Sequence, residues 1–275
     1  MNKGFSLVIR NGVPLISADC INSTGMFSAY YATGHGGVSE VGDGCSMNLN
    51  IFKNNDSREN ARQNFDIFAT AAGVPGGSRD FVLQHECHSN NAVFVDANNL
   101  KADIFDRTAY AAGADSQLTE DSLPLFVYAS DCPTILLCDT ATGLYGTIHC
   151  GWKNCLNGTI ANWFDLFRKK CGNESALICA VGPSMCQDCF EVDEDVRELF
   201  LQYDKDYGQF MYCKGVKTHI DLGAVITHQL TGQGVKEENI YLCGICNKCH
   251  TEYALPSYRR SKGKNAVTGG VVWRK

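Results

Sequence analysis

The chain has 275 residues, of which 44% are apolar, and a formal net charge of −6. The acidic balance argues against a surface for nucleic acid or anionic membranes, which would need a basic stripe. No apolar run reaches the roughly 18 residues of a transmembrane helix, and Phe5–Ile9 is too short for a secretion signal. We therefore expect a cytoplasmic protein, one domain over residues 1–275, that acts on a small molecule as a monomer or small homo-oligomer.

Sequence patterns up to residue 149 predict a hairpin, a helix and further short strands. Phe5–Ile9 and Val13–Ile16 flank Asn11-Gly12, a type I′ turn signal, and Pro14 predicts that the second strand lies at a sheet edge. Ser57–Gly73 has apolar residues at helical spacing and a glycine that can end the helix. Apolar runs predict strands at Phe81–Leu83, Ala92–Val95, Leu125–Ala129, Thr134–Cys138 and Tyr145–His149.

The rest of the chain continues this mixture of helices and strands. Helices are expected at Asn157–Lys170, Asp193–Tyr203 and Asp221–Leu230, and strands at Leu177–Val181, Ile240–Leu242 and Val271–Trp273. Strands and helices do not alternate regularly, so the pattern favours an α+β fold.

Reactive side chains follow two of the predicted strands. Ser130-Asp131-Cys132-Pro133 lies between two apolar runs, and His149-Cys150-Gly151-Trp152 follows the next. The separation of Cys132 and His149 suits neighbouring strands joined by a turn at residues 139–143. Strand ends are where a rigid scaffold presents chemistry, although a buried cysteine and a hydrogen-bonded histidine would have the same pattern.

A further histidine cluster is Gln84-His85-Glu86-Cys87-His88. If this segment is extended, Glu86 and His88 share one face and His85 and Cys87 the other. His88, Cys132 and His149 together would then make a nitrogen and thiolate set suited to zinc or copper. The alternative is a surface histidine at a strand end.

Basic residues occur at two places that suit an anion. Lys153 lies at the start of a predicted helix, where backbone N–H groups and a cation favour negative charge. Ser257-Tyr258-Arg259-Arg260 is either an anion clamp or a solvated segment.

The chain has fifteen cysteines, an odd number that, without a secretion signal, indicates reduced thiols. Two C-x-x-C pairs, Cys186/Cys189 and Cys246/Cys249, lie too far apart for the loop of about 15–20 residues in a zinc ribbon. We therefore expect no shared structural zinc, and a redox role stays open for either pair.

Taken in order, several motifs resemble the laccase-domain (YfiH-type) family of purine nucleoside phosphorylase and polyphenol oxidase-like proteins. They are Gly36–Ser39, Asn48-Leu49, His88, Asp131–Pro133, His149–Trp152, Gly182-Pro183, Phe190–Val192, Asp221-Leu222 and Ser257–Arg260. The Asp-Cys-Pro and His-x-Gly-Trp pair is the most specific of these.

The resemblance implies a single α+β domain with mixed β-sheets flanked by helices, similar to cysteine deamidase toxins. It implies a metal held by His88, Cys132 and His149, and it implies zinc-dependent phosphorolysis of adenosine, inosine, guanosine or methylthioadenosine, with adenosine deamination. In deamination the metal would activate the attacking water, with Glu86 or Asp131 moving the proton.

For phosphorolysis, Lys153, Arg259 and Arg260 are expected to hold phosphate. Three positions depart from the family pattern. Gly34 and Lys153 stand where the family usually has arginine, and Glu86 where it usually has glutamine. Phosphate affinity is the property that these differences affect.

Three other functions remain open. The first is a copper-dependent polyphenol oxidase, although seven histidines are few for a multi-copper cluster. The second is a thiol hydrolase with Cys132 as nucleophile and His149 as base. The third is a non-enzymatic redox or assembly protein that uses Cys186 and Cys189.

Overall fold

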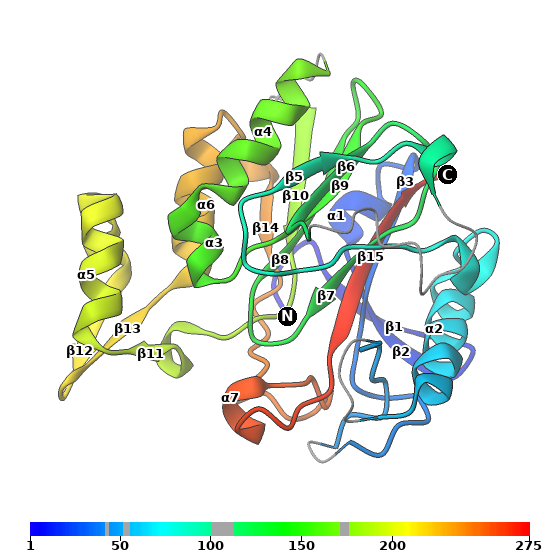
Figure 1. Cartoon of the computed structure of the whole chain (residues 1–275), viewed down its shortest axis with the longest axis horizontal. Helices are drawn as coiled ribbons and strands as arrows, with labels where there is room; N and C mark the ends of the chain where they lie inside the picture. Colours follow the sequence, from blue (N-terminus) through cyan, green and yellow to red (C-terminus); the bar gives the residue numbers. More distant parts are fainter. Residues whose placement is uncertain (42–43, 52–55, 101–112, 171–175) are drawn as a thin grey trace.

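A computed structural model describes residues 1–41, 44–51, 56–100, 113–170 and 176–275. Two six-stranded sheets form its centre (Figure 1). The first sheet has the order β1 (Ser6–Arg10), β2 (Val13–Ser17), β3 (Phe27–Ala32), β15 (Thr268–Arg274), β7 (Leu125–Ala129) and β4 (Val82–Leu83). The second has the order β14 (Ile240–Leu242), β10 (Leu177–Val181), β8 (Thr134–Asp139), β9 (Tyr145–His149), β6 (Ser116–Thr119) and β5 (Ala92–Phe94). Both sheets mix parallel and antiparallel pairs, as an α+β fold allows.

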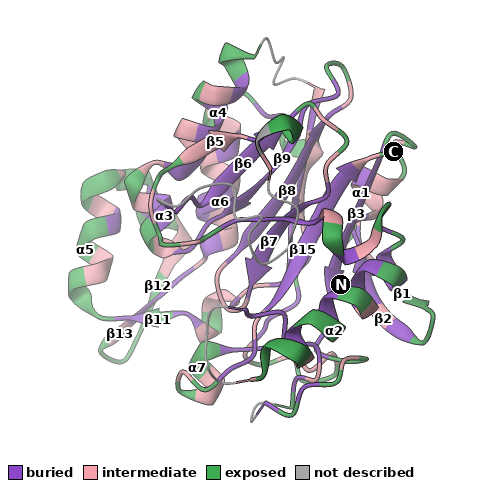
Figure 2. Cartoon of the chain, turned by 45° about the vertical axis from the view of Figure 1, so that its right-hand side comes forward, coloured by how far each residue is buried: buried purple, intermediate pink, exposed green. Residues whose placement is uncertain are grey.

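The two sheets pack face to face, and helices cover their outer faces. On β8, Leu136 and Cys138 belong to the core between the sheets, whereas Ile135 and Leu137 face the helices. The first sheet is covered by α2 (Arg58–Ala72), and the second by α3 (Trp152–Asn157), α4 (Thr159–Lys169) and α6 (Leu222–Gly232). Figure 2 shows the central strands buried throughout. Strands buried on both faces have continuous apolar runs, which is why their bounds were readable in the sequence.

A small third sheet extends from the side of this body (Figure 1). Its order is β11 (Glu191–Val192), β13 (Lys217–Ile220) and β12 (Met211–Lys214), next to α5 (Glu194–Tyr203). Two further short helices are α1 (Asp19–Asn22) and α7 (Tyr258–Ser261).

The predicted N-terminal hairpin is confirmed, but the edge position of its second strand is wrong. Asn11 and Gly12 have φ values of 50° and 78°, as a type I′ turn requires. β2 lies between β1 and β3, so β1 is the edge strand. Pro14 is tolerated because the register with β3 begins only at Leu15, so its missing N–H removes no bond of that ladder.

The predicted helices are confirmed with one change. Ser57 accepts a hydrogen bond from the Asn60 N–H at the start of α2, and Gly73 ends it with φ 79°. The helix expected at Asn157–Lys170 begins later, at Thr159, because Gly158 has φ 84° and separates it from α3. Within the described residues, no helix is long and apolar enough to cross a membrane.

Candidate metal centre and substrate pocket

Cys132 lies where the chain passes from the first sheet to the second. β7 ends at Ala129 and β8 begins at Thr134, so residues 130–133 form the crossover. The Pro133 carbonyl accepts a hydrogen bond from the Cys150 N–H (2.8 Å), which fixes the crossover against the end of β9. The proline that interrupts the apolar pattern therefore marks a change of sheet.

His149 is the last residue of β9 and pairs with Thr134 in the antiparallel ladder with β8. Its Nδ1 lies 2.7 Å from Asp115 Oδ1, and its backbone N–H donates to the Asp115 carbonyl, also at 2.7 Å. Asp115 therefore accepts the Nδ1 proton and turns Nε2 toward the pocket. Burial opposes the charged ring, but Glu86 and Asp115 raise the pKa of His149 well above its usual value, so a metal at Nε2 would displace a proton.

His88 is held in a loop, so the extended conformation on which the predicted faces of Gln84–His88 depended is absent. β4 ends at Leu83, and His88 has φ 59°, a backbone region that such a residue seldom adopts. The Asp115 carboxylate accepts the N–H groups of His88 (3.0 Å) and Ser89 (2.6 Å), and these bonds fix the turn. Glu86 and His88 both line the pocket, as expected, but so does His85.

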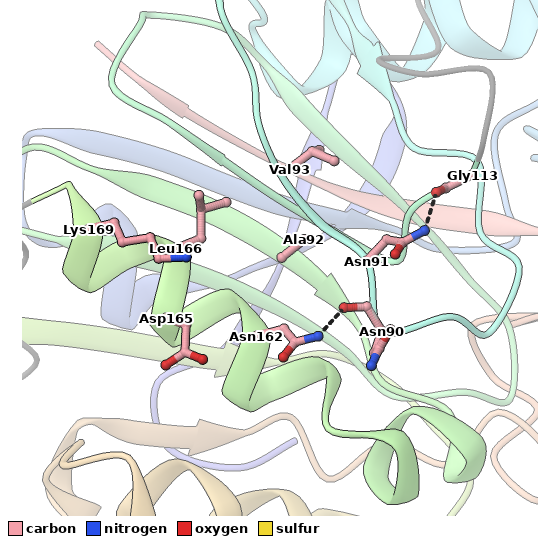
Figure 3. Close-up of a pocket in the computed structure, with 9 residues that line it drawn as sticks. All are labelled: Asn90, Asn91, Ala92, Val93, Gly113, Asn162, Asp165, Leu166 and Lys169. Carbon is pink, nitrogen blue, oxygen red and sulfur yellow. Dashed lines mark hydrogen bonds between the residues drawn. The ribbon is translucent and has the colours of Figure 1, made fainter.

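The next residues of this loop are anchored on its other side (Figure 3). Asn162 donates to the Asn90 carbonyl (2.8 Å), and Asn91 donates to the Gly113 carbonyl (3.1 Å). The cavity drawn there has a volume of about 400 Å³. Its charged lining residues are Asp165 and Lys169, and it contains no histidine or cysteine. It is therefore separate from the pocket that His88 lines.

Asp115 is a candidate site residue that sequence reasoning missed. Its side chain is fully buried and accepts hydrogen bonds from His149, from the backbone of three loop residues and from the Ser89 hydroxyl. Burial alone would raise the pKa of Asp115, but the bonds from His149 and Ser89 outweigh it and lower the pKa. An isolated aspartate before a short polar strand offered no motif by which to find it.

The three predicted ligands converge. Their ligand atoms on His88, Cys132 and His149 all lie within 4.8 Å of one another, and Cys132 Sγ is 4.0 Å from His88 Nε2. Burial opposes ionisation of Cys132, yet hydrogen bonds with both histidines lower its pKa to about 6. Two imidazoles and a readily formed thiolate make a donor set that fits zinc or copper.

Gly151 of the His-x-Gly-Trp motif leaves room for this cluster. A Cβ at this position would lie 2.8 Å from Cys132 Sγ and 3.4 Å from the His88 ring. A side chain at this position would therefore displace the Cys132 thiol or the His88 ring.

Two acids flank the ligands. Glu86 Oε2 is 3.9 Å from His149 Nε2, and its Oε1 accepts the Tyr128 N–H at 2.7 Å. Burial, partly offset by His149, raises the pKa of Glu86 to about 8. Burial also raises the pKa of Asp131, against the hydrogen bond that its Oδ2 accepts from the Arg259 N–H at 2.8 Å. Asp131 thus holds α7 at the pocket.

The cluster opens into a pocket of about 720 Å³. Its wall includes the rings of Tyr128, Trp152, Phe190 and Tyr258, together with Met185, Lys153 and Arg259. Arg260 lies outside the wall: its guanidinium donates to the carbonyls of Asn247, Lys248 and Leu255. Of the three predicted anion-binding residues, the structure thus brings Lys153 and Arg259 to the pocket but not Arg260.

Comparison with known proteins identifies the family to which the chain belongs. Residues 28–275 match the family model described as multi-copper polyphenol oxidoreductase laccase. The chain is 28% identical over 200 residues to adenosine deaminase RL5 from an unknown prokaryotic organism, covering 71% of this chain and 76% of that protein. It is 23% identical over 265 residues to a purine nucleoside phosphorylase of Bacteroides thetaiotaomicron, covering 95% and 97%.

Two solved structures share the fold. A Bacillus licheniformis hypothetical protein, YfiH, and YlmD from Geobacillus stearothermophilus each superpose with a TM-score of 0.85 at 22% identity, and each match covers both chains completely. These matches confirm the predicted α+β architecture with mixed sheets.

Proposed function

We propose that this chain, which belongs to the multi-copper polyphenol oxidoreductase laccase family, is a zinc-dependent purine nucleoside enzyme. It would carry out phosphorolysis and adenosine deamination. The observation that carries the proposal is the convergence of His88, Cys132 and His149 in the lining of a pocket that also has aromatic and cationic side chains. The names of its relatives, adenosine deaminase and purine nucleoside phosphorylase, support the same substrate class.

His88, Cys132 and His149 would hold the zinc, with Asp115 orienting His149. When bound, zinc supplies Lewis acidity and an activated water at neutral pH. We also propose a reducing cytoplasm for the chain, where Cys132 stays available as a ligand.

A purine nucleoside suits the pocket because its base is flat and its ribose is polar, and the pocket offers both aromatic and polar side chains. Trp152, Phe190 and Tyr258 offer ring faces for the base. The volume of about 720 Å³ admits a nucleoside together with an anion.

Glu86 is the residue that we propose for proton transfer. With a pKa of about 8 it is mostly protonated at neutral pH, so it can donate to a purine nitrogen. In phosphorolysis the glycosidic C–N bond breaks, a C–O bond to phosphate forms, and the departing base takes this proton. In deamination the oxygen of water forms a bond to C6, the C6–N bond breaks, and the amino group takes a proton and leaves as ammonia.

Lys153 and Arg259 are the residues that we propose for phosphate binding, since both line the pocket. Gly34 cannot be replaced by the arginine usual in the family without movement of the backbone. A Cβ there would lie 1.8 Å from the Ala254 carbonyl oxygen. The anion therefore depends on fewer guanidinium groups here, and we expect weaker phosphate binding than in relatives that have the arginine.

The proposal is tested on purified, zinc-loaded protein incubated with adenosine, with and without phosphate, and analysed by chromatography. We expect inosine without phosphate, and ribose 1-phosphate with free base when phosphate is present. Cys132→Ala should abolish both. Zinc-loaded protein that forms neither product would contradict the proposal.

A second candidate is a copper-dependent polyphenol oxidase, which the family description and the copper-compatible donor set favour. Copper-loaded and zinc-loaded samples of one preparation, assayed with a phenol and with adenosine, distinguish the two. Turnover of the phenol alone would favour the oxidase.

A further inference from the structure

The two C-x-x-C pairs, 57 residues apart in the sequence, meet in the folded chain. The Sγ atoms of Cys186, Cys189, Cys246 and Cys249 all lie within 4.8 Å of one another. We propose that these four thiolates bind a second metal ion, a structural zinc, separate from the centre at His88.

The topology explains why such distant pairs meet. β10 and β14 are parallel neighbours in the second sheet, with Val181 opposite Leu242 at their ends. The segments after them continue side by side: the Ser184 N–H donates to the Ile245 carbonyl (3.1 Å), and the Asn247 N–H donates to the Ser184 carbonyl (3.2 Å). Each segment reaches its first cysteine within a few residues. The short loop between the two cysteine pairs of a zinc ribbon is therefore not needed, because the sheet brings these two pairs together.

The local geometry suits four-coordinate zinc. Zn–S bonds of about 2.3 Å in a tetrahedron place the sulfur atoms roughly 3.8 Å apart. Cys186 Sγ and Cys249 Sγ are already 3.9 Å apart, which is far beyond a disulfide bond. The other distances, up to 4.8 Å, need less than about 1 Å of side-chain movement.

Backbone turns direct the sulfurs inward. Within one pair, the Cys189 N–H donates to the Cys186 carbonyl (3.0 Å), and in the other the His250 N–H donates to the Cys246 carbonyl (3.0 Å). The Cys186 N–H donates to Cys246 Sγ at 3.3 Å, a bond that favours a thiolate. Lys248 lies between the two cysteines of the second pair in the sequence.

The site joins two segments of the pocket wall. Met185 and Phe190, which line the pocket, flank the first pair. The second pair encloses Asn247 and Lys248, whose carbonyls accept the Arg260 guanidinium of α7. Zinc here would hold the segment of Phe190 and the α7 segment of Arg259 together without touching substrate.

The test is metal analysis of the full-length protein, purified under reducing conditions with zinc and washed with chelator. Cys132→Ala removes a ligand of the first centre, so the zinc that it retains reports on the four-cysteine site. We expect about one zinc per chain in this variant. Adding Cys249→Ser should abolish this retention, whereas Cys213→Ser should not. Cys249 and Cys213 are both exposed, so the two serine variants carry similar folding risk.

Cobalt replacement gives a readout independent of stoichiometry. Cobalt in the Cys132→Ala protein should show the intense thiolate-to-metal absorption of a four-sulfur tetrahedral site, lost on adding Cys249→Ser. Cys132→Ala protein without zinc, or a disulfide between the two pairs in freshly purified protein, would overturn the proposal. Because this signal does not depend on Cys132, it is unaffected if the nucleoside activity is absent.

Discussion

Asp115→Asn should weaken metal binding at His88, Cys132 and His149 although Asp115 is not itself a ligand. Its two oxygens face donors on both sides: Oδ1 faces His149 Nδ1 and the His88 N–H, and Oδ2 faces Ser89. Whichever way the asparagine amide turns, its NH₂ group points at donors and cannot accept from them.

The size of the effect follows from these contacts. Loss of a carboxylate that orients a metal-binding histidine costs about 10–100-fold in metal affinity, or about 1.4–2.8 kcal/mol. Removing one charged, buried hydrogen bond should also lower the free energy of unfolding by about 1.5–3 kcal/mol. Both effects should appear in one variant, with metal binding measured by competition against a zinc chelator and stability by denaturant unfolding of the metal-free protein.

Asp139→Asn is the matched control. Asp139 is equally buried. It lies at the turn of the β8–β9 hairpin, at the opposite end from His149, and accepts the N–H groups of Ala141 and Thr142. It should lose similar stability but keep its zinc affinity. If Asp115→Asn binds zinc within about threefold of the parent, or if both variants lose zinc affinity equally, orientation by Asp115 is refuted.

Four further outcomes are expected. Gly151→Ala should weaken zinc retention by about tenfold because its Cβ meets Cys132 Sγ at 2.8 Å; Gly232→Ala, with nothing within 4 Å, is its control, and equal retention in both would contradict the steric argument. Glu86→Gln should lower kcat by about 10²-fold with zinc content unchanged, and an unchanged kcat would exclude Glu86 as the proton donor. In metal-free protein, the rate of Cys132 alkylation, measured by mass spectrometry, should rise with pH around a midpoint of about 6, because the lowered pKa makes Cys132 a thiolate above that pH. A midpoint near that of an ordinary thiol would contradict this. Arg259→Ala should raise the KM for phosphate in steady-state kinetics. Arg260→Lys should lower only the midpoint of thermal unfolding, because Arg260 donates to backbone carbonyls. A raised KM for phosphate in Arg260→Lys, with no change in Arg259→Ala, would place Arg260 in the anion site.

The fold was most predictable where burial dominates. The bounds of β7, β9 and β10 agree with their apolar runs because both faces of these strands are buried. β6, with the sequence Ser-Gln-Leu-Thr, is equally buried but has no apolar run. Its polar side chains are accommodated only in the finished sheet, so local pattern could not reveal it.

The site was predictable only in part. His88, Cys132 and His149 came from ordered motifs, and the structure brings them together. Asp115 and the meeting of the two cysteine pairs depend on which strands become neighbours across the sheet. The spacing along the chain between Asp115 and His149, and that between the two cysteine pairs, does not indicate those neighbours.

The position of β15 has a consequence for synthesis of the protein. Residues 268–274 form β15, which lies between β3 and β7, and both of these strands are made more than a hundred residues earlier. Until that stretch leaves the ribosome, β3 and β7 each have an open edge that exposes them to chaperones and to self-association. We expect closure of the first sheet to precede metal capture, because β7, which pairs with β15, leads directly into the crossover that carries Cys132. A nascent chain stalled before residue 268 should therefore acquire no metal at this centre.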